Sequence, residues 1–217
     1  MLKFLVVMQF LLISHVIAGA VALGSAFSAI STKKGSKNHM FVGRIYSLAM
    51  FYVVVGAFIL SVVRPNPFLF SIALFSGYLV WTGFRRARYR NAVLNNIDKV
   101  TVVMGVLIIV ILLGYGLNLI LSQNSIGIVL IFFGLGMVTF VVEDNRALKG
   151  ELYKSKLRIA NHLQRMLGGT IATITAVLVQ QLVPRIQNNQ IPEFVIWIGP
   201  TIVLTPLIFY WSKKILS

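Results

Sequence analysis

The sequence predicts an all-α integral membrane protein, a bundle of seven transmembrane helices with its N-terminus outside and its C-terminus in the cytoplasm. Hydrophobic residues make up 58% of the chain, charged residues make up 12%, and the mean hydropathy is +0.87. Soluble domains carry about 25% charged residues. Seven apolar runs in the sequence reach or approach the length of roughly 20 residues that a membrane-spanning helix needs. The loops between these runs are alternately rich and poor in basic residues, and this alternation predicts the orientation of the helices in the membrane.

The apolar runs leave only short loops between them. We therefore predict a single polytopic membrane domain over residues 1–217, with no separate soluble domain. The runs cover approximately residues 4–30, 39–63, 67–84, 100–122, 126–142, 157–183 and 194–211.

Lysine and arginine residues determine the predicted topology, because seventeen of the 20 fall on one side of the membrane and three on the other. The seventeen are Lys33, Lys34, Lys37, Arg44, Arg85, Arg86, Arg88, Arg90, Lys99, Arg146, Lys149, Lys154, Lys156, Arg158, Arg165, Lys213 and Lys214. By the positive-inside rule, their side is the cytoplasm. The net charge of +15 thus reflects topology and attraction to lipid headgroups. We expect the lipid bilayer of a bacterial plasma membrane as partner, no nucleic acid, and either a membrane-protein partner or a homo-oligomer.

The first run, 4–30, has the basic start and small residues of a secretory signal. Its removal would leave the first basic loop outside, so we expect it to be retained as a span. His15 lies well inside this run. An ionisable residue there needs a partner or a cavity, so His15 either lines a transport path or is a neutral imidazole bonded to a carbonyl or hydroxyl.

The second run, 39–63, places His39, Gly43 and Tyr46 on one helical face. Arg44 lies beside that face and near enough to the helix start to reach the interface. These residues form either part of a functional site or an ordinary interfacial belt of polar and aromatic side chains.

The middle of the chain places its charges at the ends of the apolar runs. The third run is followed by a basic stretch at 85–90, which we interpret as a cytoplasmic anchor. Asp98 precedes the fourth run, and Glu143 and Asp144 follow the fifth at the cytoplasmic border. Residues 145–160 mix charged residues with leucines and are predicted to form an amphipathic segment on the membrane surface.

The last two runs carry polar and helix-breaking residues. Threonines 170, 173 and 175 of the sixth run can bond to helix carbonyls or to a ligand. Pro200 and Pro206 each remove a backbone donor from the seventh run, so we expect a kinked helix whose freed carbonyls line protein or a cavity.

Three histidines are present, and only two of them can share a ligand. His39 and His162 both lie near the cytoplasmic ends of their helices, whereas His15 is about 20 Å away in depth by the helical rise. The sequence therefore permits one bis-histidine site, at His39 and His162, for a b-type haem or a metal ion. Arg44 and Arg165 lie at the same level and could pair with haem propionates. The acids Asp98, Glu143 and Asp144 also lie at this level and could help the histidines to hold a metal ion. Alternatively, this level is simply the charged interface.

Several kinds of chemistry are excluded. The chain contains no cysteine, which removes disulfides and thiolate metal sites. It has no serine, histidine and aspartate constellation, no phosphate-binding glycine loop and no HExxH helix, so hydrolysis and nucleotide chemistry have no support.

Two segments resemble a known family. They are His39-x-x-x-Gly43-Arg44-x-Tyr46, with the following Phe68-Leu69-Phe70 and Ser76-Gly77-Tyr78-Leu79-x-x-x-Gly83, and the later His162-x-x-Arg165-Met166. They are similar to a group of bacterial polytopic membrane proteins, the domain-of-unknown-function family 2306. The resemblance implies a multi-pass architecture and draws attention to His39 and His162, whose placement is similar to that in two-haem membrane cytochromes.

Three functions stay open at this point. The protein could bind haem or metal through His39 and His162 for electron transfer. It could transport an ion or small solute along a path lined by His15, the threonines of the sixth run and the kinked seventh helix. It could also be a structural or accessory subunit without chemistry.

Overall fold

The computed structural model describes residues 2–88, 95–149, 155–185 and 191–217. Over these ranges the chain is helical without strands, and seven helices are long and apolar enough to cross a membrane. The prediction of an all-α, multi-pass membrane protein is therefore confirmed. The side that each terminus faces and the bacterial plasma membrane stay predictions.

Each predicted run corresponds to one helix. The helices are α1 (Leu2–Ser31), α2 (Lys37–Val63), α3 (Pro67–Arg88), α4 (Asn96–Leu121), α5 (Gly127–Leu148), α6 (Ser155–Leu182) and α7 (Glu193–Leu216), and a short 3₁₀ helix η1 (Val183–Arg185) follows α6.

Four of these helices extend several residues further on the basic side than the apolar runs indicate, namely α3, α4, α5 and α7. A boundary drawn from hydropathy falls at the first charged residues, but a helix can continue through charged residues that form ion pairs. Within the predicted amphipathic segment, residues 145–148 belong to α5 and 155–160 to α6, while 150–154 lie outside the described residues.

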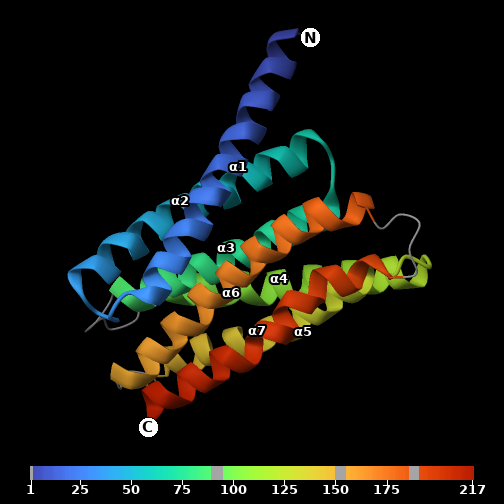
Figure 1. Cartoon of the computed structure of the whole chain (residues 1–217). Coiled ribbons are helices and arrows are strands. Elements are labelled where there is room, and N and C mark those ends of the chain that lie inside the picture. The colour runs from blue at the N-terminus through green and yellow to red at the C-terminus, as the bar shows by residue number, and fades with distance from the viewer. Residues whose placement is uncertain (1, 89–94, 150–154, 186–190) are drawn as a thin grey trace. The chain divides into compact units, whose positions relative to one another are not determined.

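The chain divides into two compact units, Met1–Val80 and Trp81–Ser217, and α3 passes from the first into the second. In unit 1, α1 and α2 form an antiparallel hairpin (Figure 1). The Tyr52 hydroxyl of α2 donates a hydrogen bond to Ser14 Oγ of α1 at 2.8 Å. The rings of Phe58 and Phe70 pack edge to face. Large apolar side chains such as Phe10 remain exposed, as expected for helices that contact lipid.

In unit 2, α4 packs along α5 and α6 packs along α7, while α5 also contacts α7 (Figure 1). Glycines bring α4 and α5 into backbone contact. A Cβ on Gly127 would lie against the Gly116 carbonyl oxygen, and a Cβ on Gly134 would come 2.7 Å from Leu113 Cδ2. Small residues of this kind drive helix association in lipid, because they let the backbones approach closely.

Candidate functional site

Arg165 of α6 is the most deeply buried charge in the described part of the chain, with 0% of its side chain exposed. Its guanidinium donates to Asp144 at 2.8 Å and to Glu143 at 3.2 Å, both on α5. It also reaches two backbone carbonyls, those of Phe140 and Asn161, at 3.2 and 3.3 Å. A buried guanidinium is tolerated only when it is paired and hydrogen-bonded in this way.

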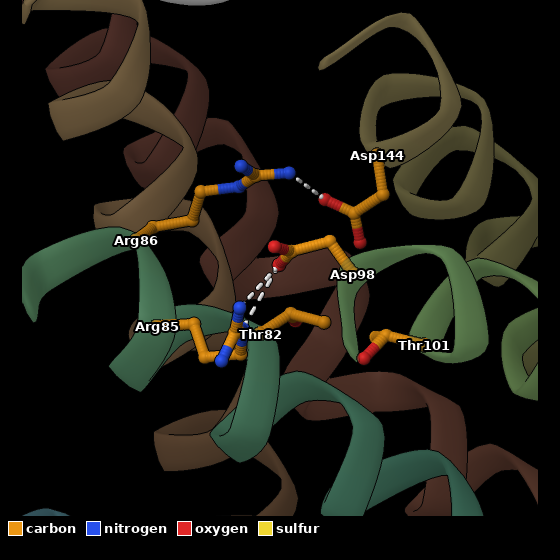
Figure 2. A pocket seen from close by; sticks show the side chains of 6 residues that line it. All are labelled: Thr82, Arg85, Arg86, Asp98, Thr101 and Asp144. Carbon is orange, nitrogen blue, oxygen red and sulfur yellow. Dashed lines mark hydrogen bonds and ion pairs between the residues drawn. The ribbon is translucent and has the colours of Figure 1, made fainter. Parts of the chain in front are cut away.

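Asp144 joins α6 to α3. Its Oδ1 accepts a hydrogen bond from Arg86 Nη2 at 2.6 Å as well as the bond from Arg165, and only 4% of its side chain is exposed. Figure 2 shows Arg86 projecting from α3 toward Asp144. Arg86, Glu143, Asp144 and Arg165 are called the ion cluster below. Two cations and two anions make the cluster formally neutral.

A second ion pair lies beside the cluster. Arg85 pairs with Asp98 at 2.8 Å (Figure 2). Asp98 also closes the capping box that starts α4 by accepting from the Asn95 backbone N–H. The capping box fixes the Asp98 carboxylate at the first turn, where a negative charge is favoured by the helix dipole. Arg85 is thereby held on the side of α3 that faces α4.

A small cavity is lined by both the Arg86–Asp144 and the Arg85–Asp98 ion pairs. Its lining consists of Thr82, Arg85, Arg86, Asp98, Thr101 and Asp144 (Figure 2). Its volume of about 10 Å³ is close to the roughly 10–15 Å³ that one water molecule requires. The charged lining provides the polar partners that such a water needs.

The inward face of α6 carries polar atoms without partners. Within the described ranges, Asn161 Nδ2, Arg165 Nε and Thr175 Oγ1 are buried and lack a hydrogen bond. At about 100° per residue these three positions fall within about 80° of the helix circumference, and they span about 21 Å of its length. We call Asn161, Arg165 and Thr175 the α6 polar face.

Two other threonines of α6 donate their hydroxyl hydrogen bonds to backbone carbonyls, which the Thr175 hydroxyl does not do in the described part of the chain. Thr170 Oγ1 donates to the Met166 carbonyl at 2.9 Å, and Thr173 Oγ1 donates to the Gly169 carbonyl at 3.0 Å. Among the described contacts Thr175 makes no bond of this kind. Its hydroxyl is therefore available to a water molecule or a ligand.

His39 lies in unit 1, at the junction of α1 and α2. Its Nδ1 is 3.1 Å from the Ala29 carbonyl oxygen, and its backbone N–H donates to Ser36 Oγ at 3.1 Å. The Lys34 ammonium also donates to the Ala29 carbonyl, at 2.8 Å. Partial burial lowers the pKa of Lys34. These contacts complete the C-terminus of α1, where cations are favoured.

The remaining predicted residues fall in different places. Tyr46 is buried in unit 1, and Arg44 is exposed there. His162 belongs to unit 2, where its Nδ1 lies 2.9 Å from the Gly83 carbonyl oxygen. The pairing of His39 with His162 therefore stays a prediction. Among the described residues, no group of three or more His, Cys, Asp or Glu side chains is arranged to hold a metal ion.

His15 packs against Gly56 in the α1–α2 hairpin. A Cβ at Gly56 would come 3.0 Å from His15 Nδ1, so the glycine makes room for the ring. Among the described residues, His15 Nδ1 is buried and has no hydrogen-bond partner. Both a neutral imidazole and a role of His15 on a path stay predictions.

Sequence reasoning places Asp98, Glu143 and Asp144 at the membrane level of Arg165, but it does not pair them with arginines and it interprets Arg86 as part of a membrane anchor. One signal favours such pairs. The chain has only five acidic residues, and three of them, Asp98, Glu143 and Asp144, adjoin apolar runs on the basic side. Acids in that position are natural partners for arginines that enter the membrane.

The chain is thus a multi-pass membrane protein whose second unit buries a neutral cluster of paired charges beside a polar helix face. Comparison with protein-family models, curated proteins and solved structures finds no match. The resemblance to family 2306 stays a prediction, so the site is interpreted from its own chemistry.

Proposed function

We propose that this protein transports a small ion or polar solute across the membrane along a path lined by α6. The observation that supports this most strongly is the α6 polar face, which combines a fully buried Arg165 with unsatisfied polar atoms among the described residues. A buried polar atom left without a partner costs about 1–3 kcal/mol. Water or a passing solute would supply the missing partners.

The position of the α6 polar face agrees with such a path. Ionisable residues inside membrane segments commonly mark ion and substrate routes. Gly168 and Ala172 are small and lie, by their spacing, between Arg165 and Thr175 on the same arc. A structural subunit would gain stability from apolar residues at the three positions of the α6 polar face instead.

Helix α7 also has backbone carbonyls without helical partners. It packs along α6 and contains Pro200 and Pro206 in its interior. A proline lacks the N–H that would bind the carbonyl four residues earlier, so the Ile196 and Ile202 carbonyls lose their helical partners. Freed carbonyls are tolerated in membrane helices where they line a cavity or neighbouring protein.

The path can be tested by cysteine accessibility, because the native chain has no cysteine. Thr175→Cys and Ala172→Cys should react with a charged methanethiosulfonate reagent in membrane vesicles. Val177→Cys is the matched control, since Val177 is 47% exposed on the apolar side of α6. We expect the first two to react roughly tenfold faster than the control, because a thiolate forms only in contact with water.

Two results would speak against the path. Equal, slow labelling of all three variants would mean that the α6 polar face is dry, and the structural function would then be preferred. If Thr175→Cys were labelled and Ala172→Cys were not, Thr175 would line an isolated water pocket rather than a continuous path.

A second candidate function is electron transfer by a haem or metal bound at His39 and His162. One observation favours it: each ring places Nδ1 next to a backbone carbonyl, that of Ala29 or Gly83. This arrangement selects the tautomer in which Nε2 carries the lone pair, as in metal-ligating histidines. Arg165, proposed for a propionate, pairs with Asp144 and Glu143, which weakens that part of the hypothesis.

Optical spectroscopy tests this second candidate. If it is right, haem-supplied protein will show a Soret band and sharp α and β bands after dithionite reduction. Both His39→Ala and His162→Ala should abolish these bands, because loss of either axial ligand destroys the bis-histidine site. A featureless spectrum from folded protein would contradict haem binding.

A further inference from the structure

The two acids of the ion cluster are held differently. Asp144 Oδ1 is shared by Arg86 and Arg165, and its side chain is 4% exposed. Glu143 Oε2 meets Arg165 Nη1 at 3.2 Å, the longest ion pair among the described residues, and its side chain is 30% exposed. The Glu143 carboxylate is therefore partly exposed, whereas the Asp144 carboxylate is buried between the two arginines that it binds.

Protonation of Glu143 therefore costs less free energy than protonation of Asp144. If Glu143 takes up a proton, Arg165 keeps its bond to Asp144 and its bonds to the Phe140 and Asn161 carbonyls. If Asp144 took up a proton, Arg86 and Arg165 would both lose the negative charge that they share. Breaking two buried ion pairs at once is more costly than breaking one.

The charged groups that act on Glu143 come from three helices. They are Arg165 on α6, Asp144 on α5 and Arg86 on α3. On α4, Asp98 is engaged by Arg85. On α7, which contacts α5, the basic residues Lys213 and Lys214 are exposed. The charge of Glu143 is thus balanced chiefly by Arg165.

We infer that Glu143 is the proton-exchanging residue of the path, so that the proton is the ion transported or coupled. This inference rests on the proposed function. A proton from water adds to the Glu143 carboxylate, and the ion pair with Arg165 opens while Arg165 stays on Asp144. The carboxylic acid then returns its proton to water on the α6 polar face, and the Glu143–Arg165 ion pair forms again.

Infrared difference spectroscopy of the reconstituted protein, recorded as the pH is changed, tests this directly. Protonation of Glu143 should produce a carboxylic C=O band that shifts in D₂O. Glu143→Gln should lose this band, because glutamine keeps the size of the side chain but cannot take up a proton. Glu193→Gln should retain it, because Glu193 lies exposed at the start of α7, outside the ion cluster.

The outcomes separate this inference from the proposed function. A band lost in Glu143→Gln alone supports the inference. A wild-type spectrum without a titrating band, or a band that survives in Glu143→Gln, overturns it even if Thr175→Cys is labelled and the path stands. Conversely, a dry Thr175→Cys with a titrating Glu143 would refute the path and leave a buried proton-exchanging carboxyl.

Discussion

Replacing Asp144 with asparagine is expected to lower the stability of the protein by about 3–5 kcal/mol, the usual cost of breaking a buried ion pair from one side. The substitution removes the charge that Arg86 and Arg165 share at 2.6 and 2.8 Å. Glu143 would then be the one acid left in the ion cluster, and among the described contacts it pairs with Arg165. The measurement is the unfolding midpoint of the detergent-solubilised protein, followed by tryptophan fluorescence.

Glu143→Gln provides the comparison for Asp144→Asn. It removes an acid from the same cluster but leaves Arg165 bonded to Asp144, so the loss should be about 1.5–3 kcal/mol, near that of one charged hydrogen bond. Lys213→Gln, at an exposed position, should leave the midpoint unchanged. If Asp144→Asn and Glu143→Gln lowered stability equally, the view of Asp144 as the shared anchor of two arginines would be wrong.

The helices could be predicted from the sequence because the bilayer imposes a simple length rule. A run of apolar residues near the spanning length has few alternatives to a helix in lipid. The rule does not specify where a helix ends once charges begin. Helix α3 continues through Arg85 and Arg86 because Asp98 and Asp144 pair with these side chains, which depends on contacts between helices.

The candidate site was only partly predictable, for a related reason. Arg165 stood out as an arginine inside the sixth run, but its partner could not be chosen from sequence alone. Arg86 and Asp144 are 58 residues apart, and basic residues outnumber acids by 20 to five. Which arginine meets which acid depends on how α3, α5 and α6 pack. The unsatisfied atoms of the α6 polar face likewise become apparent only when burial is known.

The second large effect is expected at Gly127, the first residue of α5. Gly127→Ala should destabilise the protein by about 1–3 kcal/mol, the range for overpacking a tight contact. The new Cβ would lie against the Gly116 carbonyl oxygen and 2.9 Å from Leu119 Cβ. The turn at 122–126 holds the two helices together here, with Asn124 N–H bonded to the Leu119 carbonyl at 2.9 Å. Helix α5 therefore cannot move away without breaking the turn.

Two alanine variants on the same helix isolate this backbone contact. At Gly136 a Cβ meets nothing within 4 Å, so Gly136→Ala should leave the unfolding midpoint unchanged or raise it slightly. At Gly134 the nearest atom is the end of the Leu113 side chain, which can rotate away, so the loss should be smaller than at Gly127. The expected order of destabilisation is therefore Gly127, then Gly134, then Gly136. Equal midpoints for Gly127→Ala and Gly136→Ala would show that α4 and α5 are not held in backbone contact.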